Sequence, residues 1–208
     1  LALVAQSSDK LKPLSDAVKK VNVNVIKGGG SARIQPISRG GGGGTWAAYD
    51  VLQEFHAVPV NNFRPQGNAL PEKLFRENVE KEYDIKSQAC YRCGITCHNN
   101  ISEKNADGSK GEFLAKFDYE PLNLLSTNIG IHDAGQAARL IQLGDNYGMD
   151  AISLGVTISY ALSYNERHPQ ATILNGATFG DYEKIRELII QAGEGKLPEI
   201  GYGSMRLS

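Results

Sequence analysis

The three cysteines of this chain lie within one short segment, as Cys90-x2-Cys93-x3-Cys97. Thiolates this close together are typical of sites that bind a thiophilic metal or an iron–sulfur cluster. A tetrahedral metal site or a cubane cluster takes four ligands, and this motif offers three. The spacing therefore predicts a metal or cluster site from which one ligand is missing.

Other interpretations of the cysteines stay open. Cysteine packs well in protein cores, so the three residues could be inert or redox-active thiols. Zinc is a stronger alternative, because His98 directly follows Cys97 and would complete a set of four ligands. Structural zinc ligands usually come as two pairs separated by a loop, so the spacing favours a cluster over zinc. A disulfide framework is disfavoured, since it uses even numbers of cysteines spread along a secreted chain.

Composition and charge argue against several partners. The chain has 208 residues and a net charge of −1, and its basic residues form no stripe with interleaved aromatics. This pattern argues against binding to nucleic acid or to an anionic membrane. No apolar run is long enough to span a membrane, and the apolar start, Leu1 to Val4, lacks the basic flank of a signal peptide. Together with the clustered thiols, these features predict a cytoplasmic location.

Apolar periodicity predicts a mainly α fold of seven or eight helices with little sheet. The expected helices span residues 8–21, 46–55, 71–83, 122–129, 133–143, 150–167 and 182–192. Their expected N-terminal caps include Ser8, Thr45, Asp133, Asp150 and Asp181. Gly144 is expected to end the helix that Asp133 begins. A short hairpin is expected between residues 94–98 and 112–117, and an extended loop over residues 59–65.

Two glycine runs, Gly28 to Gly30 and Gly40 to Gly44, lie before the second expected helix. Their simplest interpretation is a flexible linker, because glycine costs entropy to order and packs no side chain. A phosphate-binding loop is a weaker interpretation, since no Lys-Ser/Thr pair ends the run and no clear strand precedes it. We therefore expect residues 1–45 to form a helix and linker, and residues 46–208 to form a helical domain.

Three carboxylates outside the cysteine segment are candidates for site chemistry. Asp145 and Asp150 stand on one Gly-rich turn, where they can accept hydrogen bonds from a ligand rich in N–H groups, such as a pterin, purine or guanidinium group. The competing interpretation of Asp150 is an ordinary helix N-cap. Glu120 precedes a proline at an expected helix entrance, where a carboxylate is usually solvated. Burial beside a site would raise the pKa of Glu120 and suit it to proton transfer.

Taken together, these motifs resemble the tungsten-dependent aldehyde ferredoxin oxidoreductases. The cysteine segment, then Asp118-Tyr119-Glu120, then the segment 144–153 follow one another in that family's order and at its distances. The family typically reads D-x-x-G-L-D-T-I-S at the last motif, where this chain has Met149 for the leucine and Ala151 for the threonine. Residues 57–63 are similar to the family's L-P-x-x-N-F loop.

The resemblance implies a fold and a set of cofactors. Family members have a mainly β N-terminal domain and two helical domains, so the chain is expected to be the central, multi-helical domain with little β. In the family, the first three cluster cysteines lie in this domain and the fourth in the C-terminal one, which implies a [4Fe-4S] cluster at the three cysteines. Asp145 and Asp150, with the backbone of Met149 close by, would bind one of two pterins that chelate tungsten. Molybdenum is the alternative metal.

The resemblance also implies an activity. Glu120 matches the family's active-site glutamate, and the reaction is oxidation of a small aldehyde to a carboxylic acid, with electrons passing to ferredoxin or to an electron-transfer subunit. The catalytic subunit of tungsten-type benzoyl-CoA reductases, which belongs to the same family, is the leading alternative. A non-catalytic iron–sulfur electron-transfer module is a third possibility. The second pterin motif and the active-site histidine have no counterpart here, so this segment alone is not expected to be catalytic. The sequence leaves open whether the chain forms a homo-oligomer or a hetero-oligomer.

Overall fold

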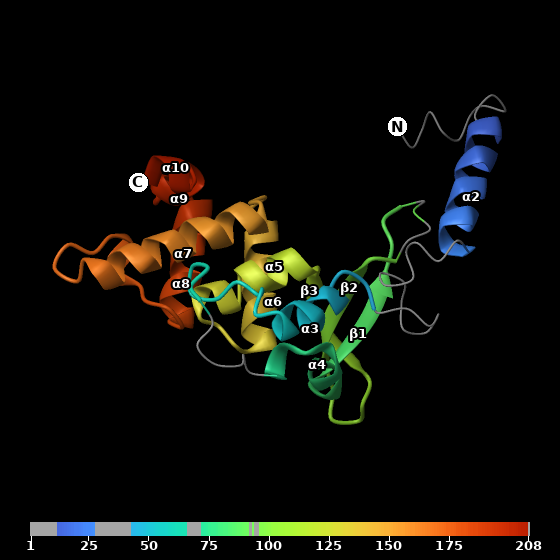
Figure 1. The fold of residues 1–208 in the computed structure, drawn as a ribbon, viewed down its shortest axis with the longest axis horizontal. Coiled ribbons are helices and arrows are strands. Elements are labelled where there is room, and N and C mark those ends of the chain that lie inside the picture. Colours follow the sequence, from blue (N-terminus) through green and yellow to red (C-terminus); the bar gives the residue numbers. More distant parts are fainter. Residues whose placement is uncertain (1–11, 28–42, 66–71, 92, 94–95, 208) are drawn as a thin grey trace.

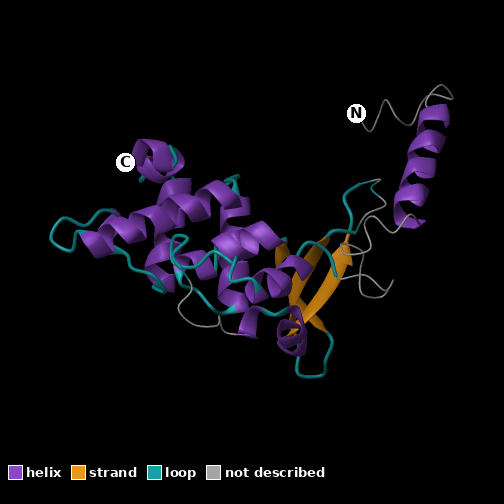
Figure 2. Ribbon diagram, in the orientation of Figure 1, coloured by secondary structure: helices purple, strands orange, loops and turns teal. Residues whose placement is uncertain are grey.

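The computed structural model describes residues 12–27, 43–65, 72–91, 93 and 96–207. In chain order, its helices are α2 (Lys12–Lys27), α3 (Ala47–Glu54), α4 (Arg76–Glu82), α5 (Tyr119–Leu124), α6 (Ala134–Asn146), α7 (Ala151–Arg167), α8 (Tyr182–Gly193), α9 (Pro198–Gly201) and α10 (Ser204–Leu207). The strands β1 (Tyr83–Gln88), β2 (His98–Lys104) and β3 (Lys110–Phe117) form one antiparallel sheet in that order. Short 3-10 turns lie at Glu72–Leu74, Thr127–Ile129 and Leu174–Gly176. The sheet lies at one side of the helices α5 to α8 (Figures 1 and 2).

The sheet is the main departure from the expected fold. Helices prevail, as predicted, and the sheet is small, but it has three strands where one short hairpin was expected. The second arm of that hairpin, residues 112–117, lies within β3 and pairs with β2. The first arm of the expected hairpin lies partly outside the described residues, and β2 begins at its last residue, His98. The expected helix over 71–83 is instead a 3-10 turn followed by α4, which ends at Glu82. It ends there because Tyr83 pairs with Glu103 at the start of β1.

The helices that follow the sheet agree well with the predicted caps. Asp133, Asp150 and Asp181 cap α6, α7 and α8, which confirms all three predictions. Each carboxylate accepts a hydrogen bond from the backbone N–H three residues later, at 2.8, 2.7 and 3.2 Å respectively. The expected helix 122–129 is shifted: α5 begins at residue 119, and a 3-10 turn takes up its second half. Ser8 lies outside the described residues, and α2 runs on to Lys27.

The core forms where α3, the end of β3 and the helices α5 to α8 meet. Trp46 and Phe117 are fully buried and pack edge to face, with ring centroids 5.2 Å apart. The Trp46 indole N–H also donates to the carbonyl of Leu74 at 3.1 Å. These contacts fix the start of α3 against the end of β3. The two segments therefore have defined positions beside the loop that carries the cysteines.

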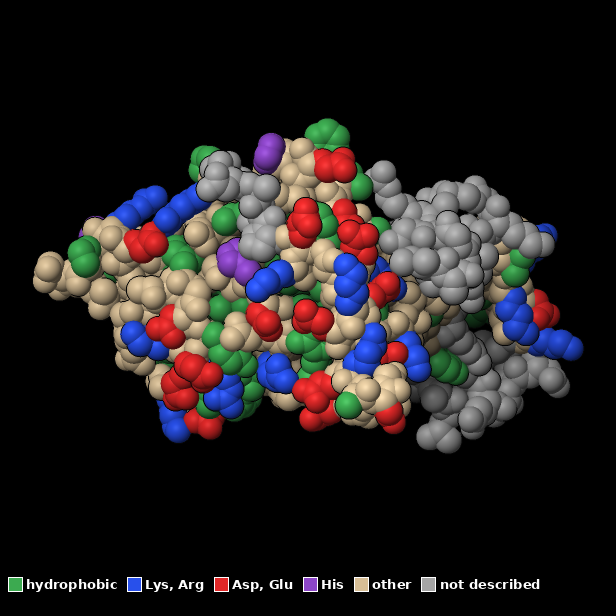
Figure 3. Space-filling view, turned by 90° about the horizontal axis from the view of Figure 1, so that it is seen from below, with side chains coloured by type: hydrophobic (Ala, Val, Ile, Leu, Met, Phe, Trp, Pro, Cys, Tyr) green, Lys and Arg blue, Asp and Glu red, His purple; other side chains and the backbone are tan. Residues whose placement is uncertain are grey.

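The surface of the described part is mixed in charge. Acidic and basic side chains are interspersed over the face in Figure 3, in keeping with the near-neutral net charge. Leu14, Val18 and Val21 on α2 are exposed. None of the helices in the described ranges is both long and apolar enough to cross a membrane.

Asp50 on α3 carries a carboxyl group that should make stability depend on pH. One of its oxygens is buried without a hydrogen-bond partner among the described residues. Burial, together with the charges of Glu77 and Glu54, raises the pKa of Asp50 from 3.8 to about 6. Between these values the folded chain holds a proton that the unfolded chain has lost. Stability therefore falls as the pH rises through this window, and the cost persists at neutral pH.

We predict that Asp50→Asn raises the free energy of unfolding at neutral pH by about 1–2 kcal/mol, after allowance for solvent screening. Below the unfolded pKa the gain should vanish, because Asp50 is then protonated in both states. Urea unfolding at about pH 7 and pH 3.5 measures both effects. Glu199→Gln, which removes an exposed carboxylate on α9, is the control. Equal stability of Asp50→Asn and the parent protein at neutral pH would contradict the prediction.

Candidate cofactor site

The three cysteines lie on the loop that joins β1 to β2. Cys90 and Cys93 are exposed, Cys97 is half-buried, and none forms a disulfide. The backbone N–H of Cys93 donates to the carbonyl of Cys90 at 2.9 Å, so a turn brings these two residues together. Within the described part of the chain, no three His, Cys, Asp or Glu side chains converge on a position for a metal ion. The structure therefore gathers the thiols on one loop without closing a ligand set.

Residues 43–45 pack directly against this loop. The backbone N–H of Thr45 donates to the carbonyl of Cys97 at 2.9 Å. Gly43 and Gly44 are buried with φ angles of +90° and +88°, and a Cβ on Gly44 would lie 2.4 Å from the Cys97 carbonyl oxygen. Glycine is therefore required at this close approach. The expectation of a flexible linker is wrong for these two glycines, and the rest of both glycine runs lies outside the described residues.

The side chain of Thr45 does not cap α3, contrary to prediction. Trp46 holds the cap position, without a side-chain hydrogen bond to the helix. The Thr45 hydroxyl donates instead to Oδ1 of Asp118 at 3.2 Å and accepts the backbone N–H of Tyr119 at 3.2 Å. Thr45 thus holds the start of α5, where Glu120 lies, next to the cysteine loop.

Glu120 itself lies in the first turn of α5 and is exposed. It therefore lacks the burial beside a site that the sequence analysis considered for it. Its position is set through its neighbours, because Thr45 binds both Asp118 and Tyr119. Glu120 is consequently an accessible carboxylate at a fixed place beside the cysteine loop.

The end of β3 adds a pair of charges that the sequence analysis missed. Nζ of Lys116 lies 3.2 Å from Oδ2 of Asp118. Partial burial raises the pKa of Asp145, the charge of Lys116 lowers it and the charge of Asp118 raises it. This aspartate at the end of α6 therefore lies within the field of both charges. Burial and then the charge of Asp118 raise the pKa of Cys97. Asp118 follows the last residue of β3 with an extended backbone, so the i, i+2 spacing that puts side chains on one face was a usable sequence signal.

The predicted pterin-binding residues bracket the turn between α6 and α7. Gly144 does not end α6, as had been expected, but is buried within it. The helix ends at Asn146 with Tyr147 as its cap, and Gly148, whose φ is +69°, follows that cap. The backbone N–H groups of Gly148 and Met149 donate to the carbonyls of Asp145 and Gly144, each at 3.0 Å. These paired bonds form a Schellman-type helix end and fix the turn.

Asp145 and Asp150 are both exposed on either side of this turn, and Met149 is half-buried between them. Asp150 is an N-cap, as the simpler interpretation held, and the hydrogen bonds from Ser153 lower its pKa. The carboxylate therefore stays ionised well below neutral pH. A capping carboxylate still has lone pairs to offer a ligand, because an ionised aspartate accepts several hydrogen bonds.

Two buried polar atoms flank Cys97 without a partner among the described residues, Oγ1 of Thr96 and Nδ1 of His98. Burial and then the charge of Lys116 lower the pKa of His98, which favours a neutral imidazole. Buried polar groups are normally hydrogen-bonded, so such atoms point to a missing partner. The sulfurs of an iron–sulfur cluster accept hydrogen bonds and would satisfy both groups. Zinc bound by His98 would satisfy only the nitrogen.

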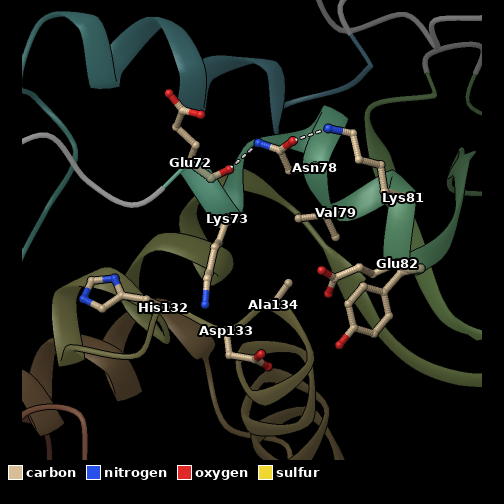
Figure 4. Close-up of a pocket in the computed structure, with 10 residues that line it drawn as sticks. Glu72, Lys73, Asn78, Val79, Lys81, Glu82, His132, Asp133 and Ala134 are labelled. Atoms are coloured by element: carbon tan, nitrogen blue, oxygen red, sulfur yellow. Dashed lines mark hydrogen bonds between the residues drawn. The ribbon is translucent and has the colours of Figure 1, made fainter.

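A cavity of about 340 Å³ lies elsewhere, between α4 and the start of α6 (Figure 4). Lys73 extends toward His132 and Asp133 on its lower side, and Glu82 lies across from them (Figure 4). None of the predicted site residues lines this cavity. The candidate site residues lie instead on the cysteine loop, at the start of α5 and on the α6–α7 turn.

Comparison with known proteins identifies the family. A family model described as aldehyde ferredoxin oxidoreductase, domains 2 and 3, matches residues 35–208. The tungsten-containing aldehyde ferredoxin oxidoreductase of Pyrococcus abyssi is 26% identical over 79% of this chain and 25% of its own length. The enzyme of that name from Pyrococcus furiosus is 26% identical over 100% of this chain and 35% of its own length. The chain thus spans about a quarter to a third of the length of these curated relatives. On this evidence the chain belongs to the aldehyde ferredoxin oxidoreductase family.

Proposed function

We propose that this chain supplies the cluster-binding loop and one of the pterin-binding turns of a tungsten-dependent enzyme that oxidises aldehydes to carboxylic acids. The observation that carries the proposal is the network around Thr45. This residue binds the carbonyl of Cys97 through its backbone and the start of α5 through its hydroxyl. The cysteine loop and the start of α5, which are far apart in sequence, are thereby held together.

The cysteine loop would bind a [4Fe-4S] cluster. Cys90, Cys93 and Cys97 would provide three thiolates, and the fourth would come from outside the described residues. The exposure of Cys90 and Cys93 on the loop supports this role, since such thiols are accessible to a cluster. Thr96 and His98 would donate hydrogen bonds to its sulfurs. Electrons would leave through this loop to ferredoxin or to an electron-transfer subunit.

The α6–α7 turn would bind a pterin. The carboxylates of Asp145 and Asp150 would accept hydrogen bonds from N–H groups of the pterin ring, and the backbone of Met149 would lie alongside. The fixed helix end at Gly148 supports this role because it holds both carboxylates on a rigid turn. Tungsten on two such pterins, or molybdenum in its place, supplies the two-electron oxidation when bound.

Glu120 would act as the base that accepts a proton during the reaction. Oxidation of an aldehyde with water yields a carboxylic acid, two protons and two electrons, so a base beside the substrate is needed. Glu120 is exposed at the start of α5, where it can accept a proton from water and release it to solvent. The Thr45 contacts keep the start of α5 in place during turnover.

The test is a turnover assay of the metal-loaded enzyme in which this chain would be the central domain, prepared without oxygen. With short aldehydes and a viologen dye or ferredoxin as acceptor, we expect the carboxylic acid to form and two electrons to be transferred per aldehyde. Reduction of an aromatic acyl-CoA, with no aldehyde oxidation, would support the reductase alternative instead. A reducible cluster without turnover of either substrate would leave an electron-transfer module.

Asp150 allows capping and pterin binding to be separated. We predict that Asp150→Ala lowers the free energy of unfolding by about 1 kcal/mol, whereas Asp150→Ser, which keeps a good capping residue, costs only a few tenths. Both variants should lose pterin, because both lack the carboxylate. Chemical unfolding and fluorescence of the released, oxidised pterin measure the two effects. Full pterin content in Asp150→Ser would limit this residue to capping.

A further inference from the structure

The Lys116–Asp118 ion pair stands where the cysteine loop meets the end of β3. Nζ of Lys116 lies 3.2 Å from Oδ2 of Asp118, whose other oxygen accepts the Thr45 hydroxyl at 3.2 Å. The backbone N–H of Thr45 in turn donates to the carbonyl of Cys97 at 2.9 Å. A continuous chain of contacts therefore joins the ion pair to a proposed cluster ligand.

The sheet register brings the same segments together independently. Lys116 pairs with Asn100 and Phe117 with Asn99, so the end of β3 runs alongside the residues that follow Cys97. The side chain of Asp118 is only 24% exposed, against 44% for Lys116. The carboxylate is thus the less screened of the two charges, and Thr45 holds it in place.

The fields of both side chains reach the thiols. Burial lowers the pKa of Lys116, but the hydrogen bond and charge of Asp118, with the charges of Cys90 and Cys97, raise it overall. Asp118 lies two hydrogen bonds from Cys97, through the hydroxyl and then the backbone N–H of Thr45. A positive and a negative charge therefore lie beside the cysteine loop and act on it in opposite directions.

We propose that the Lys116–Asp118 ion pair sets the reduction potential of the cluster bound at the cysteine loop, an inference that rests on the proposed function. Reduction adds one electron to the cluster, so a nearby ammonium favours the reduced form and a nearby carboxylate opposes it. While both charges are present, their effects offset each other. Loss of either partner leaves the other uncompensated beside the cluster.

The experiment is a redox titration of the cluster's electron paramagnetic resonance signal in the holoprotein. Lys116→Gln should shift the potential downward, because Asp118 is left unpaired. Asp118→Asn should shift it upward, because Lys116 is left unpaired. The double variant should return close to the parent value, and Lys116→Arg, which keeps the charge, should stay near it. Lys110→Gln, at the opposite end of the same strand, is the matched control and should cause no shift.

Opposite shifts in the two single variants are the signature of charge, since a disturbed loop has no reason to respond with opposite signs. Unchanged potentials with an intact cluster signal would overturn the inference and leave the proposed function standing. Shifts in the same direction in both variants would overturn it as well, in favour of a structural effect. Absence of iron from the parent protein would overturn both the inference and the proposed function.

Discussion

Replacement of Cys93 by serine is expected to abolish the iron–sulfur signal of the holoprotein. The described chain offers three thiolates, so the loss of one removes a third of what it contributes to the cluster. The serine hydroxyl is a harder donor than the cysteine thiolate. It is therefore a poor ligand for the iron of an iron–sulfur cluster. Iron analysis, visible absorbance and electron paramagnetic resonance each report the loss.

The control for Cys93→Ser is Tyr91→Phe, a change on the same loop that removes a hydroxyl group and leaves every thiol in place. Tyr91 is 83% exposed, so the substitution creates no cavity. The control should retain the cluster in full. An unchanged cluster signal in Cys93→Ser would contradict the ligand assignment.

Glu120→Gln is expected to lower turnover by about 10²–10⁴-fold, the usual contribution of a positioned acid or base. Glutamine has nearly the same shape but cannot take up the proton. Because Glu120 is exposed, the substitution should change stability by no more than about 0.5 kcal/mol. Turnover is measured per metal centre, with iron and tungsten contents determined on the same samples.

Glu199→Gln serves as the control for Glu120→Gln, since it removes an exposed carboxylate on α9 that belongs to no proposed site. Its turnover should match that of the parent protein. Undiminished turnover in Glu120→Gln would remove this residue from the reaction. Parallel loss of metal and turnover would assign it a structural role.

Features that depend on neighbours in sequence could be predicted well. Asp133, Asp150 and Asp181 were identified as caps, because a capping carboxylate binds the backbone only three residues away. The helix ends were harder to place. Helix α6 continues past Gly144, because this glycine allows the helix to pack closely on Leu154. The glycine with a left-handed conformation, which follows the helix, is Gly148.

The strand β1 and most of β2 were missed because both strands are polar. β1 reads Tyr-Asp-Ile-Lys-Ser-Gln and β2 reads His-Asn-Asn-Ile-Ser-Glu-Lys, so neither shows the apolar alternation that marks a strand. Tertiary contacts stabilise them instead. Asn99, fully buried on β2, donates to the carbonyl of Gly43 at 2.9 Å and accepts from Arg76 at 3.1 Å.

The same distinction applies to the candidate site: its local motifs could be predicted, but its long-range contacts could not. The cysteine loop, Glu120 and the aspartates of the α6–α7 turn stood out through motif spacing. Thr45 and the Lys116–Asp118 pair did not, because their importance comes from contacts between distant segments. The hydroxyl of Thr45 binds partners 73 and 74 residues away, which no local pattern reveals.

Metal analysis of the holoprotein, purified without oxygen, tests the central claim most directly. The account predicts tungsten, or molybdenum in its place, together with iron and acid-labile sulfide in the proportion of one [4Fe-4S] cluster per tungsten or molybdenum. The same preparation of Cys93→Ser should lose the iron. Zinc in place of iron would contradict the cluster assignment, and iron without tungsten or molybdenum would contradict the proposed enzyme.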